Sequence, residues 1–343
     1  MAPKNVIVTG GCGYIGSHTL ISLIEAGYSP IVIDNLANSS KETLDKVQSI
    51  TKKKFDFFEI NIIDKKKLEK VFMNKKIHAV IHFAALKVVG DSWSNTIDYF
   101  ENNVYGSLNL LSLCEKYHVE RFIFSSSANV YGLDSKTPIK ESSALSPSNP
   151  YGVSKLMVEN ILNNLFQAQS VYKKNNWKIV ILRYFNPIGA HQSGLIGEKT
   201  PEIPTNIMPY LLKVASKKLE KFTIYGDDYN TPDGTGIRDY IHVMDLSEGH
   251  VSALKKVEEL DDGESYHSVI NLGTGRGISV KELLNNFSKY TNIEIPYVVE
   301  ERRPGDIPIS FADTSFAKKE LSWSAERSLK DMIIDSWNWQ KKI

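Results

Sequence analysis

Two residues whose side chains could take part in catalysis, Tyr151 and Lys155, lie four positions apart just after Pro150, in the stretch SNPYGVSKLMVEN. Proline suits the first turn of a helix, and the apolar residues that follow predict a helix over 151–172. Residues four apart share one helix face, so the phenol and the ammonium would be neighbours. In a chain with 16 tyrosines and many lysines, this spacing alone fits a surface pair equally well.

A glycine-rich turn follows the first apolar run of the chain. Gly11, Gly13 and Gly16 satisfy G-x-G-x-x-G within TGGCGYIGSH, and Gly10 adds a further G-x-x-G spacing. Between a strand and a helix, such glycines permit a tight turn and let the backbone approach a pyrophosphate. The helix N-terminus then offers free N–H groups and a positive dipole end to the anion. The turn therefore predicts a dinucleotide site.

The second apolar run ends at Asp34. A carboxylate at this strand end accepts hydrogen bonds from an adenosine ribose and repels a 2′-phosphate, which favours NAD over NADP. The alternative is that Asp34 caps the next helix.

Three serines end a later strand, in FIFSSSANVYG (122–132), and the helix with Tyr151 follows it. Ligands of open α/β sheets bind beyond the carboxyl ends of the strands, so both segments can reach one crevice. A tyrosine pKa is ordinarily about 10. We expect the Lys155 ammonium and a positive nicotinamide to lower the pKa of Tyr151 toward neutrality. A serine, a tyrosine and a lysine beside NAD would form an alcohol-oxidising site.

The elements that must position these residues alternate along the first half of the chain. Buried strands are predicted at 5–10, 30–35, 55–60, 78–85, 121–127 and 178–186, with helices at 15–27, 40–50, 65–74, 97–117 and 151–172. This order predicts an α/β fold, a Rossmann-type doubly wound parallel sheet. After Asn186 the chain is loop-rich, with helices predicted near 207–219, 245–257, 279–290 and 328–340.

We expect a dinucleotide-binding domain over 1–186. A smaller α/β nucleotide-sugar-binding lobe is expected over 187–343, with residues 237–250 and 268–275 returning to the first domain.

The composition limits the other possibilities. A formal net charge of +1 gives no general attraction to nucleic acid or to anionic membranes. Two cysteines and eight scattered histidines, without H-E-x-x-H spacing, predict neither a disulfide framework nor a metal site. No apolar run reaches membrane-spanning length and the first strand leaves no room for a signal peptide, so we expect a cytoplasmic protein.

The glycine turn, the serine strand and Y-x-x-x-K together resemble the extended short-chain dehydrogenase/reductase superfamily. Within it, the chain is similar to the UDP-glucose 4-epimerase family from the first strand to about residue 340. The further stretches that carry this resemblance are FAALKVVGDS (83–92), NNVYGSLNLL (102–111), LRYFNPIGAH (182–191), GIRDYIHVMDLSEGH (236–250), NLGTGRGISV (271–280) and RRPGDIPISFAD (302–313).

The resemblance implies an isomerase that interconverts UDP-galactose and UDP-glucose with tightly bound NAD. Tyr151 would take the proton of the sugar 4-hydroxyl, Lys155 would bind ribose hydroxyls and depress the tyrosine pKa, and Ser127 would hydrogen-bond the 4-oxygen. A 4-keto sugar would then turn over in the site and receive hydride on its other face. The family commonly forms homodimers, here through helices 97–117 and 151–172.

The resemblance also implies two sets of binding residues. The cofactor would be bound by Gly10, Gly13, Tyr14, Ile15, Gly16, Asp34, Asn35, Asn38, Ser39, Asn61, Ile62, Phe83, Ala84, Lys87, Asn102, Tyr151, Lys155 and Tyr184. The UDP-sugar would be bound by Lys87, Ser127, Asn129, Tyr151, Phe185, Asn186, Asn206, Ile207, Thr223, Tyr225, Arg238, Tyr240, Arg303, Asp306 and Ser310.

Four positions depart from the family pattern, of which Ala85, where glycine is frequent, is a minor one. Asn61 stands where aspartate is usual near the adenine, and Asn129 replaces a usual threonine beside the sugar. Ser310 stands where enzymes restricted to UDP-glucose and UDP-galactose have tyrosine. Its small side chain would leave room for an N-acetyl group, so we expect UDP-GlcNAc and UDP-GalNAc to be accepted as well.

Other functions remain as alternatives. A 4,6-dehydratase of the same superfamily needs an added acid–base pair beside the serine strand, where this chain has Ala128 and Asn129. A decarboxylase would need a uronic acid substrate and another cation near C6. A non-catalytic NAD-dependent sensor could reuse the fold, but it would not need Ser127, Tyr151 and Lys155 together.

Overall fold

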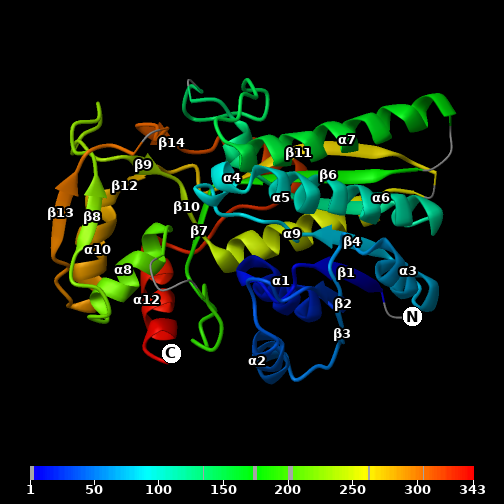
Figure 1. Cartoon of the computed structure of the whole chain (residues 1–343), viewed down its shortest axis with the longest axis horizontal. Helices are drawn as coiled ribbons and strands as arrows, with labels where there is room; N and C mark the ends of the chain where they lie inside the picture. The colour runs from blue at the N-terminus through cyan, green and yellow to red at the C-terminus, as the bar shows by residue number, and fades with distance from the viewer. Residues whose placement is uncertain (1–3, 134, 173–175, 200–203, 262, 304) are drawn as a thin grey trace.

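A seven-stranded parallel sheet forms the centre of the protein (Figure 1). The computed structural model describes residues 4–133, 135–172, 176–199, 204–261, 263–303 and 305–343. The strand order is β11-β6-β5-β4-β1-β2-β3, and every neighbouring pair is parallel. The strands are β1 (Asn5–Thr9), β2 (Ser29–Asp34), β3 (Asp56–Glu59), β4 (Ala79–His82), β5 (Arg121–Ser127), β6 (Lys178–Tyr184) and β11 (Tyr266–Leu272). The order reverses between β1 and β4, where such sheets bind ligands.

Helices cover both faces of this sheet, which confirms the doubly wound prediction. Successive strand residues point to opposite faces, so Val6 and Val8 enter one core and Ile7 enters the other. The first core also contains side chains of α1 (Tyr14–Glu25), α2 (Glu42–Thr51), α9 (Val243–Glu258) and α11 (Ser315–Leu321). The second contains side chains of α3 (Lys65–Asn74), α6 (Gly106–Lys116) and α7 (Pro150–Tyr172).

The predicted helix over 97–117 is three consecutive segments. They are α5 (Thr96–Phe100), the π-helix η1 (Glu101–Tyr105) and α6. The short α4 (Asp91–Ser94) precedes them, and the 3-10 helix η2 (Ala128–Val130) follows β5. π-helical turns are rare and are frequently found at functional sites, and this one contains the predicted cofactor residue Asn102.

The second half of the chain builds a smaller α/β lobe, at the left in Figure 1. Its helices are α8 (Ile207–Ala215), α10 (Val280–Thr291) and α12 (Leu329–Gln340), and β8 (Phe222–Tyr225) pairs with β13 (Tyr297–Glu300). A three-stranded sheet places β9 (Ile237–Arg238) between β12 (Ile278–Ser279) and β14 (Ile309–Ser310), and β7 (Asn186–Ile188) pairs with β10 (Tyr240–His242). The same half supplies β11, α9 and α11 to the central sheet and its cover.

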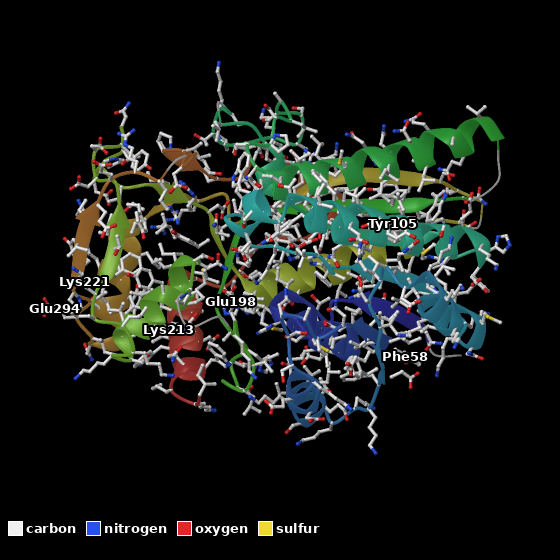
Figure 2. All side chains as sticks on the ribbon, in the orientation of Figure 1. Phe58, Tyr105, Glu198, Lys213, Lys221 and Glu294 are labelled. Carbon is white, nitrogen blue, oxygen red and sulfur yellow. The ribbon has the colours of Figure 1, made fainter. Side chains whose placement is uncertain are left out.

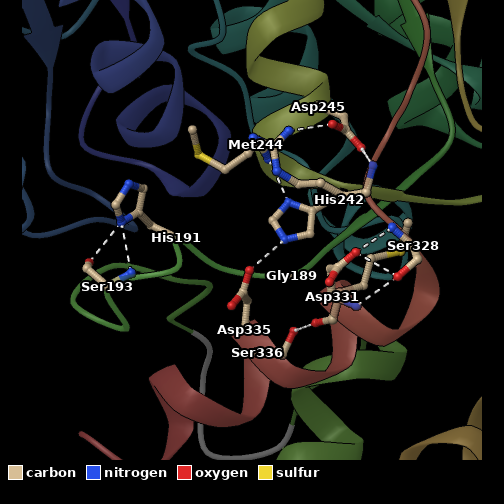
Figure 3. Close-up of polar contacts among 12 residues, drawn as sticks. Gly189, His191, Ser193, His242, Met244, Asp245, Ser328, Asp331, Asp335 and Ser336 are labelled. Carbon is tan, nitrogen blue, oxygen red and sulfur yellow. Dashed lines mark hydrogen bonds and ion pairs between the residues drawn. The ribbon is translucent and has the colours of Figure 1, made fainter. Parts of the chain in front are cut away.

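Polar contacts join α12 of this lobe to the start of α9 (Figure 3). The buried ring of His242 caps α9, because its Nδ1 accepts from the Met244 N–H at 3.0 Å. Its Nε2 lies 3.3 Å from an Asp335 carboxylate oxygen on α12. The start of α12 is fixed by a capping box of Ser328 and Asp331.

In the described ranges, no helix is both long and apolar enough to cross a bilayer.

Candidate active site

The glycine turn joins β1 to α1 and leaves the helix N-terminus open to an anion. Gly10 has a φ of +72°, and a Cβ there would lie 2.8 Å from the Ala84 nitrogen. A Cβ on Gly16 would lie 2.2 Å from the Gly10 carbonyl oxygen, so only glycine allows the helix to pack this closely against the turn. Gly13 caps α1 without any side-chain hydrogen bond, and no acidic residue lies in the first turn. A pyrophosphate therefore fits this turn sterically and electrostatically.

Asp34 holds together two loops at the end of β2. One carboxylate oxygen accepts from the Cys12 N–H at 2.9 Å, and the other accepts from the Leu36 N–H and the Ser39 hydroxyl, each at 2.9 Å. The carboxylate thus orders the turn before α2 but does not cap that helix, which begins at Glu42. Two carboxylate oxygens offer about four acceptor positions, so one remains for a ribose hydroxyl.

The other expected cofactor residues line the carboxyl edge of the sheet. The Ala84 N–H donates to the Thr9 hydroxyl at 3.3 Å, and Phe83 packs against His250 of α9 with ring centroids 4.7 Å apart. Several side-chain amides are engaged locally: those of Asn35 and Asn61 accept from the N–H two residues on, and that of Asn102 donates to Asn103. Ile15 and Ile62 pack in or against the cores of the sheet.

Asn103 is a residue that the sequence analysis missed. Its amide exchanges two hydrogen bonds with the backbone of Leu86, at 2.8 and 3.0 Å, and donates to the Ser154 hydroxyl at 2.9 Å. It thereby connects the segment that precedes Lys87 to the helix turn that carries Lys155. The letters NNVYG contain no signal for this contact, because it depends on the π-helical turn.

Ser127 ends β5, and its hydroxyl has a defined orientation. Its Oγ accepts from the Asn129 N–H at 3.2 Å and from the Asn129 side-chain amide at 3.0 Å. A hydroxyl has two acceptor positions and one donor, so the Ser127 O–H is left to donate. Asn129, which departs from the family pattern, is compatible with this arrangement because its amide supplies the second donor.

Tyr151 is 6% exposed, and burial raises its pKa to about 12, although a hydrogen bond with Ser127 lowers it. The protein's own groups therefore do not lower the pKa, and the lowering by Lys155 together with a positive nicotinamide stays a prediction. The physical reason is that desolvation of the phenolate outweighs the favourable contacts. The Lys155 ammonium lies 5.9 Å from the centre of the Tyr151 ring.

Lys155 is buried with its ammonium against β5. The Nζ donates to the Ser125 carbonyl oxygen at 2.8 Å and lies 5.0 Å from the centre of the Phe124 ring. Burial lowers the pKa of Lys155 to about 7, while the negative charge of Glu159 raises it. Tyr184, the next expected cofactor residue, lies at the end of β6, and burial raises its pKa. The helix α7 thus brings Tyr151 and Lys155 to the carboxyl ends of β5 and β6, where Ser127 and Tyr184 lie.

Glu159, one turn beyond Lys155, anchors α7 to two strands and was also missed. Its carboxylate accepts from the Ser126 hydroxyl at 2.5 Å and binds the Arg183 guanidinium through three contacts of 2.6–3.2 Å. Arg183 continues to the Tyr131 hydroxyl at 3.1 Å, which in turn donates to Asn271 of β11 at 2.6 Å. The spacing of four from Lys155 could have marked Glu159, but its partners on β5 and β6 are visible only in the fold.

The expected nucleotide-sugar residues of the smaller lobe form a second cluster. Asp306 binds Arg303 at 2.8 and 2.9 Å and lies 3.5 Å from Arg238. The Arg303 guanidinium also lies 5.1 Å from the centre of the Tyr225 ring. Ser310, 9% exposed, is the register partner of Arg238 in the β9–β14 pair. Two guanidinium groups side by side match the oxygens of a diphosphate.

The remaining expected residues lie between these clusters or beside them. Asn206 and Ile207 begin α8, Thr223 lies on β8 with its hydroxyl 3.3 Å from that of Tyr210, and Phe185 is buried after β6. Asn186 and Tyr240 are register partners in the β7–β10 pair. Among the residues that the structure describes, no hydrogen bond or ion pair joins Arg238 or Arg303 to Ser127, Tyr151 or Lys155. The described residues also contain no group of three metal-binding side chains.

Comparison with known proteins places this geometry in a family. A protein of Bacillus subtilis named UDP-glucose 4-epimerase is 50% identical over 335 residues, which cover 98% of this chain and 96% of that one. The chain belongs to the UDP-glucose 4-epimerase family. A broader family model, described as GDP-mannose 4,6 dehydratase, matches residues 7–336.

Solved structures of the UDP-glucose 4-epimerase family share the whole fold. The Stenotrophomonas maltophila enzyme, with bound NAD and formylated UDP-arabinopyranose, has a TM-score of 0.94 at 42% identity, covering 99% of this chain and 98% of that one. The Bifidobacterium longum enzyme, in complex with NAD⁺ and UDP, has a TM-score of 0.92 at 46% identity with the same coverage.

The dehydratase description of the broader model does not fit the residues beside Ser127. Ala128 and Asn129 follow the serine, and neither can act as the carboxylic acid that elimination of water requires. The Asn129 amide is moreover committed to the Ser127 hydroxyl. The local chemistry therefore agrees with epimerases and not with a 4,6-dehydratase.

Replacing Glu159 with glutamine should shift the pH dependence of turnover. The change keeps the shape of the side chain but removes the charge that opposes desolvation of Lys155, so the pKa of Lys155 falls further below its ordinary value. Lys155 then loses its proton at lower pH, and we expect the alkaline side of the kcat profile to move down by about one pH unit. Glu69→Gln, which removes a carboxylate of α3 that pairs with Lys116, is the control. An unshifted alkaline limb in a folded Glu159→Gln protein would contradict this account.

Proposed function

We propose that the protein interconverts UDP-galactose and UDP-glucose by inverting C4 of the sugar, with NAD as a tightly bound cofactor. The observation that carries this proposal is the assembly of Ser127, Tyr151 and Lys155 at the carboxyl edge of the sheet. The glycine turn, whose helix N-terminus has no side-chain cap, follows β1 at the carboxyl edge of the same sheet. The family relationship supports the same reaction and the same cofactor.

The residues of this chain fit the cofactor, which would be bound by the glycine turn, Asp34 and the neighbouring loops. When bound, NAD supplies the acceptor that takes hydride from C4 and the donor that returns hydride to the opposite face. Tyr151 would hold the proton of the 4-hydroxyl at its phenol oxygen, and the Ser127 O–H would donate to the 4-oxygen. Because burial raises the pKa of Tyr151 to about 12, its ionisation near neutral pH needs positive charge, to which Lys155 contributes and which a bound oxidised nicotinamide would complete.

The UDP portion would bind in the smaller lobe. Arg238 and Arg303 would bind the diphosphate, and Tyr225 would flank the uracil. Asp306 would accept a hydrogen bond from a ribose hydroxyl. Asp306 already aligns both guanidinium groups, so the pair is arranged before the diphosphate arrives. Such preorganisation lowers the cost of ordering long side chains on binding.

Ser310 supports a wider substrate range, and we propose that UDP-GlcNAc and UDP-GalNAc are also interconverted. The residue is buried on β14 opposite Arg238, where a larger side chain would occupy the space beside the sugar.

We also propose a cytoplasmic homodimer. Five exposed apolar side chains gather over α4, α5, η1, α6 and α7, namely Trp93, Ile97, Tyr105, Leu108 and Met157. A pocket in this patch is lined by Phe100, Val104, Tyr105, Leu108 and Met157 together with Glu101, and Figure 2 marks Tyr105 there. Contiguous exposed apolar surface of this kind marks interfaces. A monomeric mass by light scattering would contradict the dimer.

The central test of the proposed function is conversion of UDP-galactose by the purified protein without added NAD. We expect UDP-glucose to form, and Tyr151→Phe to lower kcat by about 10²–10⁴-fold because the proton of the 4-hydroxyl loses its acceptor. Tyr105→Phe, an exposed tyrosine away from the strand edge, should keep wild-type kcat. Absence of UDP-glucose even after NAD is added, or a fully active Tyr151→Phe protein, would overturn the proposal.

Ser310→Tyr tests the wider substrate range. A bulky side chain on β14 should abolish turnover of UDP-GlcNAc while turnover of UDP-galactose stays within about threefold of wild type. Product chromatography with each sugar measures both rates. If the wild-type protein does not turn over UDP-GlcNAc at high enzyme concentration, the range is limited to the non-acetylated sugars.

A further inference from the structure

A buried carboxylate lies where the two halves of the chain meet. Glu198, in the loop between β7 and α8, has a side chain only 9% exposed, and Figure 2 shows it between the smaller lobe and the sheet. One of its oxygens accepts from the Lys87 ammonium at 3.2 Å and from the Asn206 side-chain amide at 2.9 Å. No role has yet been assigned to Glu198, although both of its partners belong to the expected binding residues.

The two partners come from different parts of the fold. Lys87 follows β4 in the sheet, and its side chain is 50% exposed, so its ammonium can also reach a ligand. Asn206 stands at the N-cap of α8 but makes no capping hydrogen bond, and its side-chain N–H donates to Glu198. A single carboxylate oxygen therefore fixes one cation and one amide from opposite sides of the boundary.

The position of the charge is unusual for a purely structural ion pair. Tyr14, in the first turn of α1, lies close enough for the charge of Glu198 to raise its pKa further, after burial, and both residues line one small cavity. The carboxylate thus lies near the anion-binding end of α1 as well as near Lys87. A buried negative charge beside an anion site opposes the binding of that anion.

We infer that Glu198 is a positioning residue that shares Lys87 with the diphosphate of the nucleotide sugar, and that its charge limits the affinity for UDP. The inference rests on the proposed function, since it takes the ligand to be a UDP-sugar. Lys87 has three N–H donors, so it can keep Glu198 and contact a phosphate oxygen at the same time. We favour the nucleotide sugar over the NAD pyrophosphate because Asn206, the second partner of Glu198, lies in the smaller lobe.

Glu198→Gln separates the charge of this side chain from its shape. Glutamine retains a carbonyl oxygen for Lys87 and Asn206 but removes the negative charge. A unit charge a few ångströms from a diphosphate in a weakly hydrated site outweighs one weakened hydrogen bond, so we expect the Kd of UDP to fall by about tenfold. Glu198→Asp retains the charge and should keep the Kd within about threefold of wild type.

Isothermal titration of the NAD-containing protein with UDP measures these changes, and retained NAD and the melting temperature report folding. Glu258→Gln is a matched control, because the Lys4–Glu258 pair has nearly the same exposure, 48% and 14%, at the opposite end of β1. An unchanged or raised Kd of UDP in Glu198→Gln would overturn the inference. A higher retention of NAD with unchanged UDP affinity would also overturn it, by assigning the charge to the cofactor pyrophosphate.

Lys87→Met distinguishes failure of the inference from failure of the proposed function. We expect weaker UDP binding in this variant, since the shared cation is lost. If Lys87→Met binds UDP as tightly as wild type, Lys87 does not contact the diphosphate and the inference fails, while turnover of UDP-galactose by wild type would leave the proposed function intact.

Discussion

Burial of α7 against β5 takes the Lys155 ammonium out of water. The desolvation of this charge is the constraint on which the other contacts of the site depend. The ammonium contacts one backbone oxygen and two ring faces, none of which carries a full negative charge. Desolvation therefore lowers the pKa of Lys155 to about 7 and raises that of Tyr151 to about 12. Both pKa shifts disfavour the Tyr151 phenolate and the Lys155 ammonium, the charged pair that proton transfer from an alcohol needs. Glu159 provides the compensating charge, and Arg183 and Ser126 fix its position.

Carboxylates recur at the places where anionic or hydroxylic ligands are expected. Asp34 orders two loops beside the glycine turn, Asp306 aligns two arginines, and Glu198 joins Lys87 to Asn206. Each holds donors that a ribose or a phosphate can also use. The protein thus keeps its binding groups ordered by internal hydrogen bonds, which limits the side-chain entropy lost on binding. The accompanying cost is that a carboxylate near a bound phosphate repels it and so weakens binding of the ligand.

Much of this architecture could be predicted from the sequence, because strands buried on both faces leave continuous apolar runs and the glycine turn has a fixed spacing. The six expected strands and the doubly wound sheet are confirmed on these grounds. Helix α11 was missed because seven residues with two lysines carry little periodicity, and η1 was missed because a π-turn has no sequence signal. Glu159, Glu198 and Asn103 act through partners distant in sequence, so only the fold identifies them. The depth at which Tyr151 is buried is not visible in the residue types, so the desolvation that opposes its ionisation could not be predicted from the sequence.

The most direct test is the ionisation of Tyr151 itself, followed as the phenolate absorbance that is lost in Tyr151→Phe. The titration is done on the NAD-containing protein and again after removal of NAD. The account predicts that Tyr151 stays protonated to above about pH 10 without NAD and ionises at least two pH units lower with NAD bound, because the oxidised nicotinamide adds the positive charge that burial makes necessary. A phenolate that forms near neutral pH in both states would contradict it, because Lys155 alone would then overcome the desolvation of the site.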